Sequence, residues 1–193
     1  MCVSTLKALN SYFHTQIDEK HIAILAKKVE HDYIGVSGGI MDQMVSSIGI
    51  HGKAFFLDCL NLKYELVNFP LNWKFCLIDS EVQRNLRSSS YNDRFNELKI
   101  AEKELDVEYL GGVELNKFDS DKISSPTVIK RARHVVTENN RVLRAKECLL
   151  QDDIKQFGKL MIESHNSYSK DFEASTSDVD EIVERSRQCG ALG

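Results

Sequence analysis

The sequence predicts an α+β chain whose second part is mainly helical. Residues 54–58 form a short apolar run and residues 64–67 alternate between apolar and polar, which is typical of two paired strands. On both sides of these runs, and almost without interruption after about residue 84, apolar residues recur at helical spacing. The first part of the chain therefore mixes helices and strands, and the rest is a set of helices.

Composition limits the function classes. The 193 residues suffice for one medium domain or parts of two, and 42% are hydrophobic and 28% charged, which is ordinary for a globular protein. The net charge of −4, with acids and bases interspersed, favours no nucleic-acid partner. No apolar stretch approaches bilayer length, so we expect no membrane association. Five scattered cysteines without a CxxC pair are typical of reduced thiols and predict a cytoplasmic protein.

Two helices are expected in the first 32 residues. Residues 3–13 carry an apolar stripe, and a second helix is predicted over residues 18–32. Its predicted inward face consists of Ile22, Ile24, Leu25 and Val29. The polar residues 30–32 at its end are, by themselves, typical of a solvated helix terminus.

A glycine pair leads into a third helix. Gly38 and Gly39 lack a Cβ, so the backbone there can turn sharply and approach a ligand closely. The apolar spacing that follows places Asp42 in the first helical turn. Its carboxylate could simply complement the helix dipole and the unpaired amides. Alternatively, it could accept or orient the hydroxyl proton of a sugar or alcohol bound on the glycine backbone.

Strands are expected in the middle of the chain. The runs at 54–58 and 64–67 should pair as a hairpin, and Pro70 marks a break. Residues 73–78 form another strand-like run. Each of these strands is short, so this sheet should be small.

The remaining residues predict helices with recognisable starts. A polar, basic segment at 84–92 opens a helix that continues to about residue 105, and its arginines could hold an anion or simply lie at the surface. Ser125 and Pro126 look like the N-cap and first residue of the longest helix. Asp152 or Asp153 should cap the next one. We expect His134 and His165, which have no partner at metal-site spacing, to be partly buried and hydrogen-bonded.

Several ordered blocks together resemble the galactokinases, which belong to the GHMP family of small-molecule kinases. The most distinctive block is Gly39-Ile40-Met41-Asp42-Gln43, within residues 33–43. The others lie at residues 57–59, at 84–92, at 131–139, and at 160–165 taken together with 171–173, in the family's order and spacing. A single short motif would be a weak signal, but five ordered blocks make chance similarity very improbable.

The resemblance implies roles for individual residues. Asp42 matches the family's catalytic aspartate, the base toward the anomeric hydroxyl of galactose. Glu30, 12 residues earlier, matches a glutamate that helps to hold Mg²⁺, and Tyr91 matches a tyrosine that contacts the sugar. Gly39 belongs to the same substrate-binding stretch. ATP would be the co-substrate, since phosphoryl transfer depends on positioned carboxylates and a metal ion that bridges its phosphates.

The resemblance also implies that the chain corresponds to the middle of such an enzyme. We expect it to lack the family's N-terminal sugar-binding segment, its serine-rich phosphate loop and its C-terminal glycine-rich motif, and therefore to be inactive by itself. The implied architecture has two lobes, with residues 1–70 in the N-terminal lobe and residues 71–193 in the C-terminal lobe. A complementary fragment could supply the missing motifs. Alternatives are a non-catalytic regulatory or binding protein and an N-acetylgalactosamine kinase.

Overall fold

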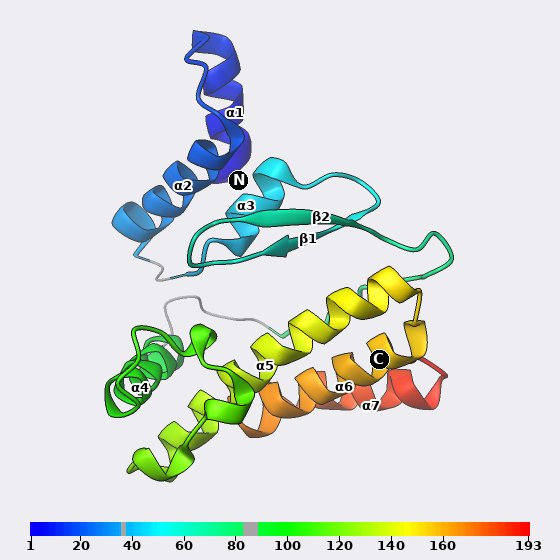
Figure 1. Ribbon diagram of the computed structural model, residues 1–193. Coiled ribbons are helices and arrows are strands. Elements are labelled where there is room, and N and C mark those ends of the chain that lie inside the picture. Colours follow the sequence, from blue (N-terminus) through cyan, green and yellow to red (C-terminus); the bar gives the residue numbers. More distant parts are fainter. Residues whose placement is uncertain (36–37, 83–88) are drawn as a thin grey trace. The chain divides into compact units, whose positions relative to one another are not determined.

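A computed structural model describes residues 1–35, 38–82 and 89–193, and the side chains of residues 89–92 lie outside this description. The chain divides into two compact units, Met1–Leu71 and Asn72–Gly193, which are described separately. Figure 1 shows that the first unit combines helices with a two-stranded hairpin and that the second is helical. The fold class predicted from the sequence, α+β with a mainly helical second part, is confirmed.

The described residues of the first unit include three α-helices. They are α1 (Cys2–Phe13), α2 (Glu19–Val29) and α3 (Met41–Ile48), and a π-helical turn, η1 (Glu30–Ile34), extends α2. Asp18 caps α2 by accepting a hydrogen bond from the backbone N–H of His21. Helix α2 contacts both α1 and α3.

The buried face of α2 differs from the predicted one. Ile22 is buried as expected, but Ile24 and Leu25 are each 37% exposed, and Ala23 and Ala26 are buried instead. The short alanine side chains allow neighbouring helices to approach closely: Ala26 packs with Val3 of α1, and Ala23 packs with Met44 of α3. A search for large apolar residues misses such a face, because the contact between helices is made by small ones.

A cluster of three polar residues, Lys7, Glu19 and Ser47, connects the three helices through hydrogen bonds. The Lys7 ammonium of α1 lies 2.6 Å from Oε2 of Glu19 and donates to the backbone oxygen of Ser47 at 2.6 Å. The Ser47 hydroxyl donates to the same Glu19 carboxylate at 2.8 Å. These hydrogen bonds lower the pKa of Glu19, with that from Lys7 having the largest effect.

The predicted hairpin is present. Strands β1 (Lys53–Leu57) and β2 (Tyr64–Asn68) pair antiparallel, with Ala54 opposite Val67 and Phe55 opposite Leu66. Phe55 and Leu57 pack against the cluster formed by α2 and α3. The hairpin thereby covers the helix that carries Asp42.

The second unit is built on the predicted long helix. Helix α5 (Pro126–Gln151) has Ser125 at its N-cap and Pro126 at its first position, and α6 (Ile154–Lys170) is capped by Asp153, as predicted. Figure 1 shows α5 and α6 running side by side, while α4 (Ser89–Glu104) also contacts α5. Short 3₁₀ turns follow α4 at Leu110–Gly112, Leu115–Lys117 and Ser120–Lys122, and α7 (Ser177–Gln188) follows α6.

The core of the second unit lies between α4, the first 3₁₀ turn and α5. Its buried members are Ala101, Leu110, Ile123, Val128, Ala132 and Val136. Four of the six come from the periodic apolar positions of α4 and α5, which is why the helical pattern was visible in the sequence.

The strand predicted over residues 73–78 is wrong, since this segment has no regular secondary structure. Trp73 packs on a helix instead: its ring lies 5.1 Å from that of Phe157 on α6, and its indole N–H donates to Asp152 at 2.6 Å. Of this run only Trp73 is buried, while Phe75, Leu77 and Ile78 are each more than half exposed, so the apolar pattern predicted neither the strand nor the burial of the segment.

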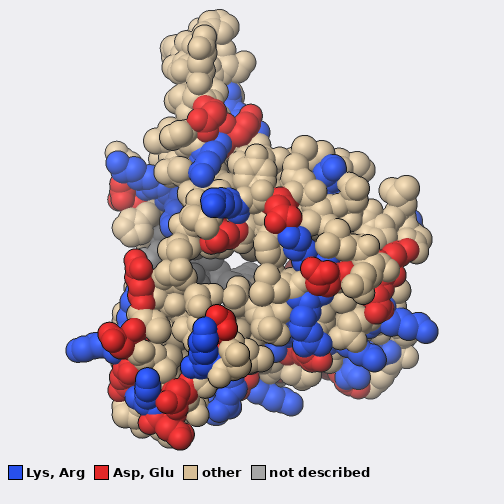
Figure 2. All heavy atoms as spheres, in the orientation of Figure 1, with Lys and Arg blue, Asp and Glu red and all other residues tan. Residues whose placement is uncertain are grey.

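The surface carries both charges. Figure 2 shows lysines, arginines, aspartates and glutamates interspersed over the visible face, in accordance with the mixed charge of the sequence. Within the described ranges, no helix is long and apolar enough to cross a bilayer.

Candidate active site

Glu30 lies at a change in helix geometry. At this residue α2 widens into the π-helical turn η1, which ends at Gly35. Gly35 has a φ of 77°, in the left-handed region that favours glycine, and its N–H bonds to the backbone oxygen of Glu30. Single π-turns are frequent at functional sites. The turn leaves the Glu30 side chain partly buried, at the end of the helix rather than fully in solvent.

Asp42 is exposed in the first turn of α3, where the sequence placed it. The N-cap of α3 is Ile40, and no side chain caps this helix by hydrogen bonding. Among the described residues, no hydrogen bond or ion pair engages the Asp42 carboxylate. Its oxygens are therefore available to a ligand, while the charge still complements the positive end of the helix.

Gln43 links this helix to Glu30. The side chain is only 8% exposed, and its Nε2 donates to Oε2 of Glu30 at 2.6 Å. Its amide oxygen, Oε1, is buried and has no hydrogen-bond partner among the residues that the structure describes. Asp42 and Gln43 are adjacent in the first turn of α3. This turn therefore exposes the carboxylate of Asp42, and its buried side chain, Gln43, binds the carboxylate of Glu30.

The structure gives less detail for the other two predicted substrate-binding residues, Gly39 and Tyr91. Gly39 is exposed two residues before α3, without a positive φ, and an added Cβ there would meet open space. Neither strain nor crowding in the chain itself therefore requires glycine at this position. Tyr91 falls within α4, and its side chain lies outside the described residues, as do Val36 and Ser37 and the polar segment at residues 84–88.

The carboxylates do not form a metal cage of their own. Among the residues that the structure describes, no group of three or more His, Cys, Asp or Glu side chains is arranged to hold a metal ion. Mg²⁺ is commonly held by only one or two carboxylates, together with substrate phosphates and water. Glu30, with one oxygen fixed by Gln43 and the other unbonded within the described chain, fits this second type of site.

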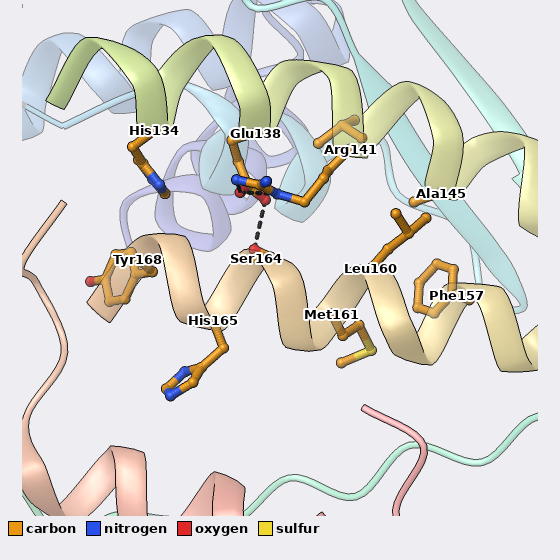
Figure 3. Close-up of a pocket in the computed structure, with 11 residues that line it drawn as sticks. His134, Glu138, Arg141, Ala145, Phe157, Leu160, Met161, Ser164, His165 and Tyr168 are labelled. Carbon is orange, nitrogen blue, oxygen red and sulfur yellow. Dashed lines mark hydrogen bonds and ion pairs between the residues drawn. The ribbon is translucent and has the colours of Figure 1, made fainter. Parts of the chain in front are cut away.

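A separate cavity of about 460 Å³ lies in the second unit, between α5 and α6. Figure 3 shows that Glu138 and Ser164 face one another across it, joined by a hydrogen bond of 2.6 Å, while Phe157 and Leu160 line its apolar end. Glu138 also pairs with Arg141 at 2.8 Å. The polar groups here satisfy one another, and none of the predicted site residues lines this cavity, so we place the candidate active site at Glu30 and Asp42.

The two histidines that line this cavity are buried or partly buried and have polar partners, as predicted. His134 is buried, and its Nδ1 lies 3.0 Å from the hydroxyl of Ser167. Burial lowers the pKa of His134. His165 is partly buried and lies 3.0 Å from a carboxylate oxygen of Asp180 on α7.

Sequence reasoning named Gln43 only as part of a motif and gave it no role. Its burial could have been inferred, because Ile40, Gln43, Met44 and Ser47 share the face of α3 that is directed into the unit. Its partner could not, because nothing local links Gln43 to a residue 13 positions away. The sequence could therefore predict that Gln43 is buried, but not that it forms a hydrogen bond with Glu30.

Comparison with known families begins with this part of the chain. Residues 1–49, which carry Glu30, Gly39 and Asp42, match the family model described as "GHMP kinases N terminal domain". This part of the chain is therefore similar to the N-terminal domain of the GHMP kinases, a family of small-molecule kinases.

Comparison with whole proteins gives a more specific resemblance. The chain is 37% identical to a galactokinase of Lactococcus lactis subsp. lactis over 96% of its own length and 38% identical to one of Enterococcus faecalis over 88%. A crystal structure titled as L. lactis galactokinase complexed with galactose matches 96% of the chain with a TM-score of 0.88 and 33% identity. The chain is thus a relative of the galactokinases, and it spans about half the length of those it matches.

Proposed function

We propose that this chain forms half of a galactokinase, which transfers a phosphoryl group from ATP to the C1 hydroxyl of galactose. The observation that carries the proposal is the contact between Glu30 and Gln43 beside the exposed Asp42. Through this contact, Glu30 and Asp42, the two carboxylates to which the resemblance assigns roles, lie on adjoining elements of one unit. The galactose-bound state of the L. lactis structure supports the same substrate for this chain.

Asp42 is the proposed catalytic residue. Its carboxylate is exposed and unengaged within the described chain, so a sugar hydroxyl can reach it. A carboxylate within hydrogen-bond distance of the attacking hydroxyl orients it and can accept its proton as the new P–O bond forms. Gly39 would leave room for the sugar beside the backbone, and Tyr91 would contact the sugar.

Glu30 is the proposed ligand of Mg²⁺, with ATP as the co-substrate. When bound, the metal ion would neutralise charge on the ATP phosphates. The chain's own contribution is a carboxylate fixed at one oxygen by Gln43. One such carboxylate suits a metal ion that takes its remaining ligands from phosphates and water.

The two compact units would correspond to parts of the two lobes of the kinase, with the boundary near Pro70 as proposed from the sequence. The other half of the relatives' length would be supplied in the same polypeptide or by a complementary one. All five cysteines are unpaired thiols, which favours a reducing compartment and hence the cytoplasm.

A chimera tests the proposal independently of the chain's ends. Residues 1–193 would replace the aligned half of L. lactis galactokinase, and ATP-dependent formation of galactose 1-phosphate would be measured. Asp42→Asn should reduce kcat by about 10²- to 10³-fold, as is typical for the loss of one preorganised catalytic group. Ser46→Ala, an exposed change on the same helix, serves as the matched control and should leave kcat unchanged.

The 193-residue chain by itself should form no detectable sugar phosphate. The proposal is wrong if a folded chimera is inactive, or if Asp42→Asn is as active as the unmodified chimera. Comparing galactose with N-acetylgalactosamine in the same assay identifies the sugar, and a preference for the acetylated sugar would refute the substrate proposed here.

A further inference from the structure

We propose that Gln43 is a positioning residue, which holds the Glu30 carboxylate in the orientation needed to bind a divalent cation. This inference rests on the proposed function and adds to it a residue with no earlier role. The carrying observation is a buried amide side chain with one half bonded to a carboxylate and the other half unpaired.

The orientation of the amide is fixed by its partner. An ionised carboxylate can only accept hydrogen bonds, so the NH₂ group of Gln43 must face Oε2 of Glu30. Turning the amide over would place its oxygen against that carboxylate oxygen. Hydrogen bonds to charged groups are also short and strong, as the 2.6 Å separation illustrates.

This orientation leaves the amide oxygen unpaired in a buried position. Leaving a buried acceptor without a donor is unfavourable, because nothing compensates the hydrogen bonds to water that the group loses on burial. In the described chain, no group donates to Oε1 of Gln43. Mg²⁺ retains several bound waters, which are hydrogen-bond donors, so a cation at Glu30 would bring the kind of partner that this oxygen lacks.

The contact also joins the two elements that carry the proposed chemistry. Glu30 directly follows α2 as the first residue of η1, and Gln43 directly follows Asp42 in the first turn of α3. One hydrogen bond therefore fixes the metal-binding carboxylate relative to the turn that presents the catalytic one. Partners that orient metal ligands in this way typically change metal affinity by about 10- to 100-fold when removed.

The test measures Mn²⁺ binding to the whole 193-residue chain by paramagnetic broadening of NMR signals from residues 29–31 and 42–44. Gln43→Met, which preserves bulk but cannot donate, should weaken Mn²⁺ binding at this place by about tenfold or more. Gln43→Asn is a milder second variant, whose shortened amide should no longer reach Glu30. The matched control is Ser47→Ala, which removes a buried hydrogen bond from the same helix without touching Glu30.

The outcomes separate the two proposals. Weaker Mn²⁺ binding in both Gln43 variants but not in Ser47→Ala supports the positioning role, since a merely structural effect would appear in the control as well. Unchanged binding in folded Gln43 variants overturns this inference alone. If Glu30→Gln leaves the broadening unchanged, or the unmodified chain shows none at these residues, the metal-binding role of Glu30 falls, and the inference falls with it.

Discussion

Arg131 of α5 donates from Nε to Oε2 of Glu97 on α4 at 2.8 Å, although Arg131 is only 1% exposed. The rest of its guanidinium reaches the segment after α6, where Nη2 lies 2.7 Å from Glu173 and Nη1 donates to the backbone oxygen of Asp171. One buried cation thus joins three segments of the second unit. Because every branch of the guanidinium is engaged, its burial is compensated.

Removing this cation should destabilise the second unit. Arg131→Met removes the shortest ion pair of Glu97 and of Glu173, which keep Arg94 at 3.2 Å and Lys130 at 3.5 Å respectively. Because both carboxylates keep a cation and are partly in solvent, the loss should lie between the about 1 kcal/mol of an exposed pair and the about 3–5 kcal/mol of breaking a fully buried one. Urea unfolding followed by the fluorescence of Trp73, the chain's single tryptophan, measures the free energy of unfolding.

The control for this prediction is an exposed pair in the same unit. Arg185 and Glu181 form an ion pair on α7 with both side chains more than half exposed, so Arg185→Met should cost less than about 1 kcal/mol. Equal losses for the two variants would show that the buried position of Arg131 has no energetic consequence.

Local features of the chain were predictable, and distant pairings were not. The caps at Ser125 and Asp153 and the first turn containing Asp42 were found because a few neighbouring residues determine them. Arg131 was noted only as the first residue of the block at 131–139, and its role was not predicted because its partners lie 34 and 42 residues away. Gln43 illustrates the same limit in the candidate site.

His134 should make stability depend on pH in a defined window. Burial lowers its pKa below the ordinary value of 6.5, so on acidification the unfolded chain binds a proton that the folded chain does not. The contribution of neutral His134 is complete above about pH 6.5 and is lost as pH falls toward its folded-state pKa. Unfolding free energies measured from about pH 8 to about pH 5 should therefore decline with acidification.

Substitution identifies the source of this decline. His134→Gln should flatten it, whereas His51→Gln, at an exposed histidine of the first unit, should leave it in place. Hydrogen bonds from Arg131 and Ser175 lower the pKa values of Glu173 and Asp180 respectively, so their contributions are lost only at more acidic pH. A decline that persists unchanged in His134→Gln contradicts the assignment.

The indole hydrogen bond of Trp73 should stabilise the segment that was expected to be a strand. Trp73→Phe keeps an aromatic ring near Phe157 but removes the donor to Asp152, so we expect a loss of about 1.5–3 kcal/mol, typical of a bond to a charged acceptor. Thermal unfolding monitored by circular dichroism measures it. Asp152→Asn preserves an acceptor oxygen, and asparagine tolerates the left-handed backbone at this position. This substitution should therefore destabilise the chain clearly less than Trp73→Phe. A larger loss of stability for Asp152→Asn would contradict the role assigned to the hydrogen bond.

Gly158 should respond to substitution with opposite signs in two contexts. It lies buried in α6, and a Cβ there would collide with the carbonyl group of Leu192, where residues 191–193 pack against the helix. In the whole chain Gly158→Ala should therefore cost about 1–3 kcal/mol through overpacking. In a chain without residues 191–193 the collision is gone, and the same change should stabilise α6 by up to about 1 kcal/mol through helix propensity. Urea unfolding of the four chains completes the cycle. If Gly158→Ala has the same sign in both backgrounds, the packing of the terminal residues on α6 does not explain the glycine.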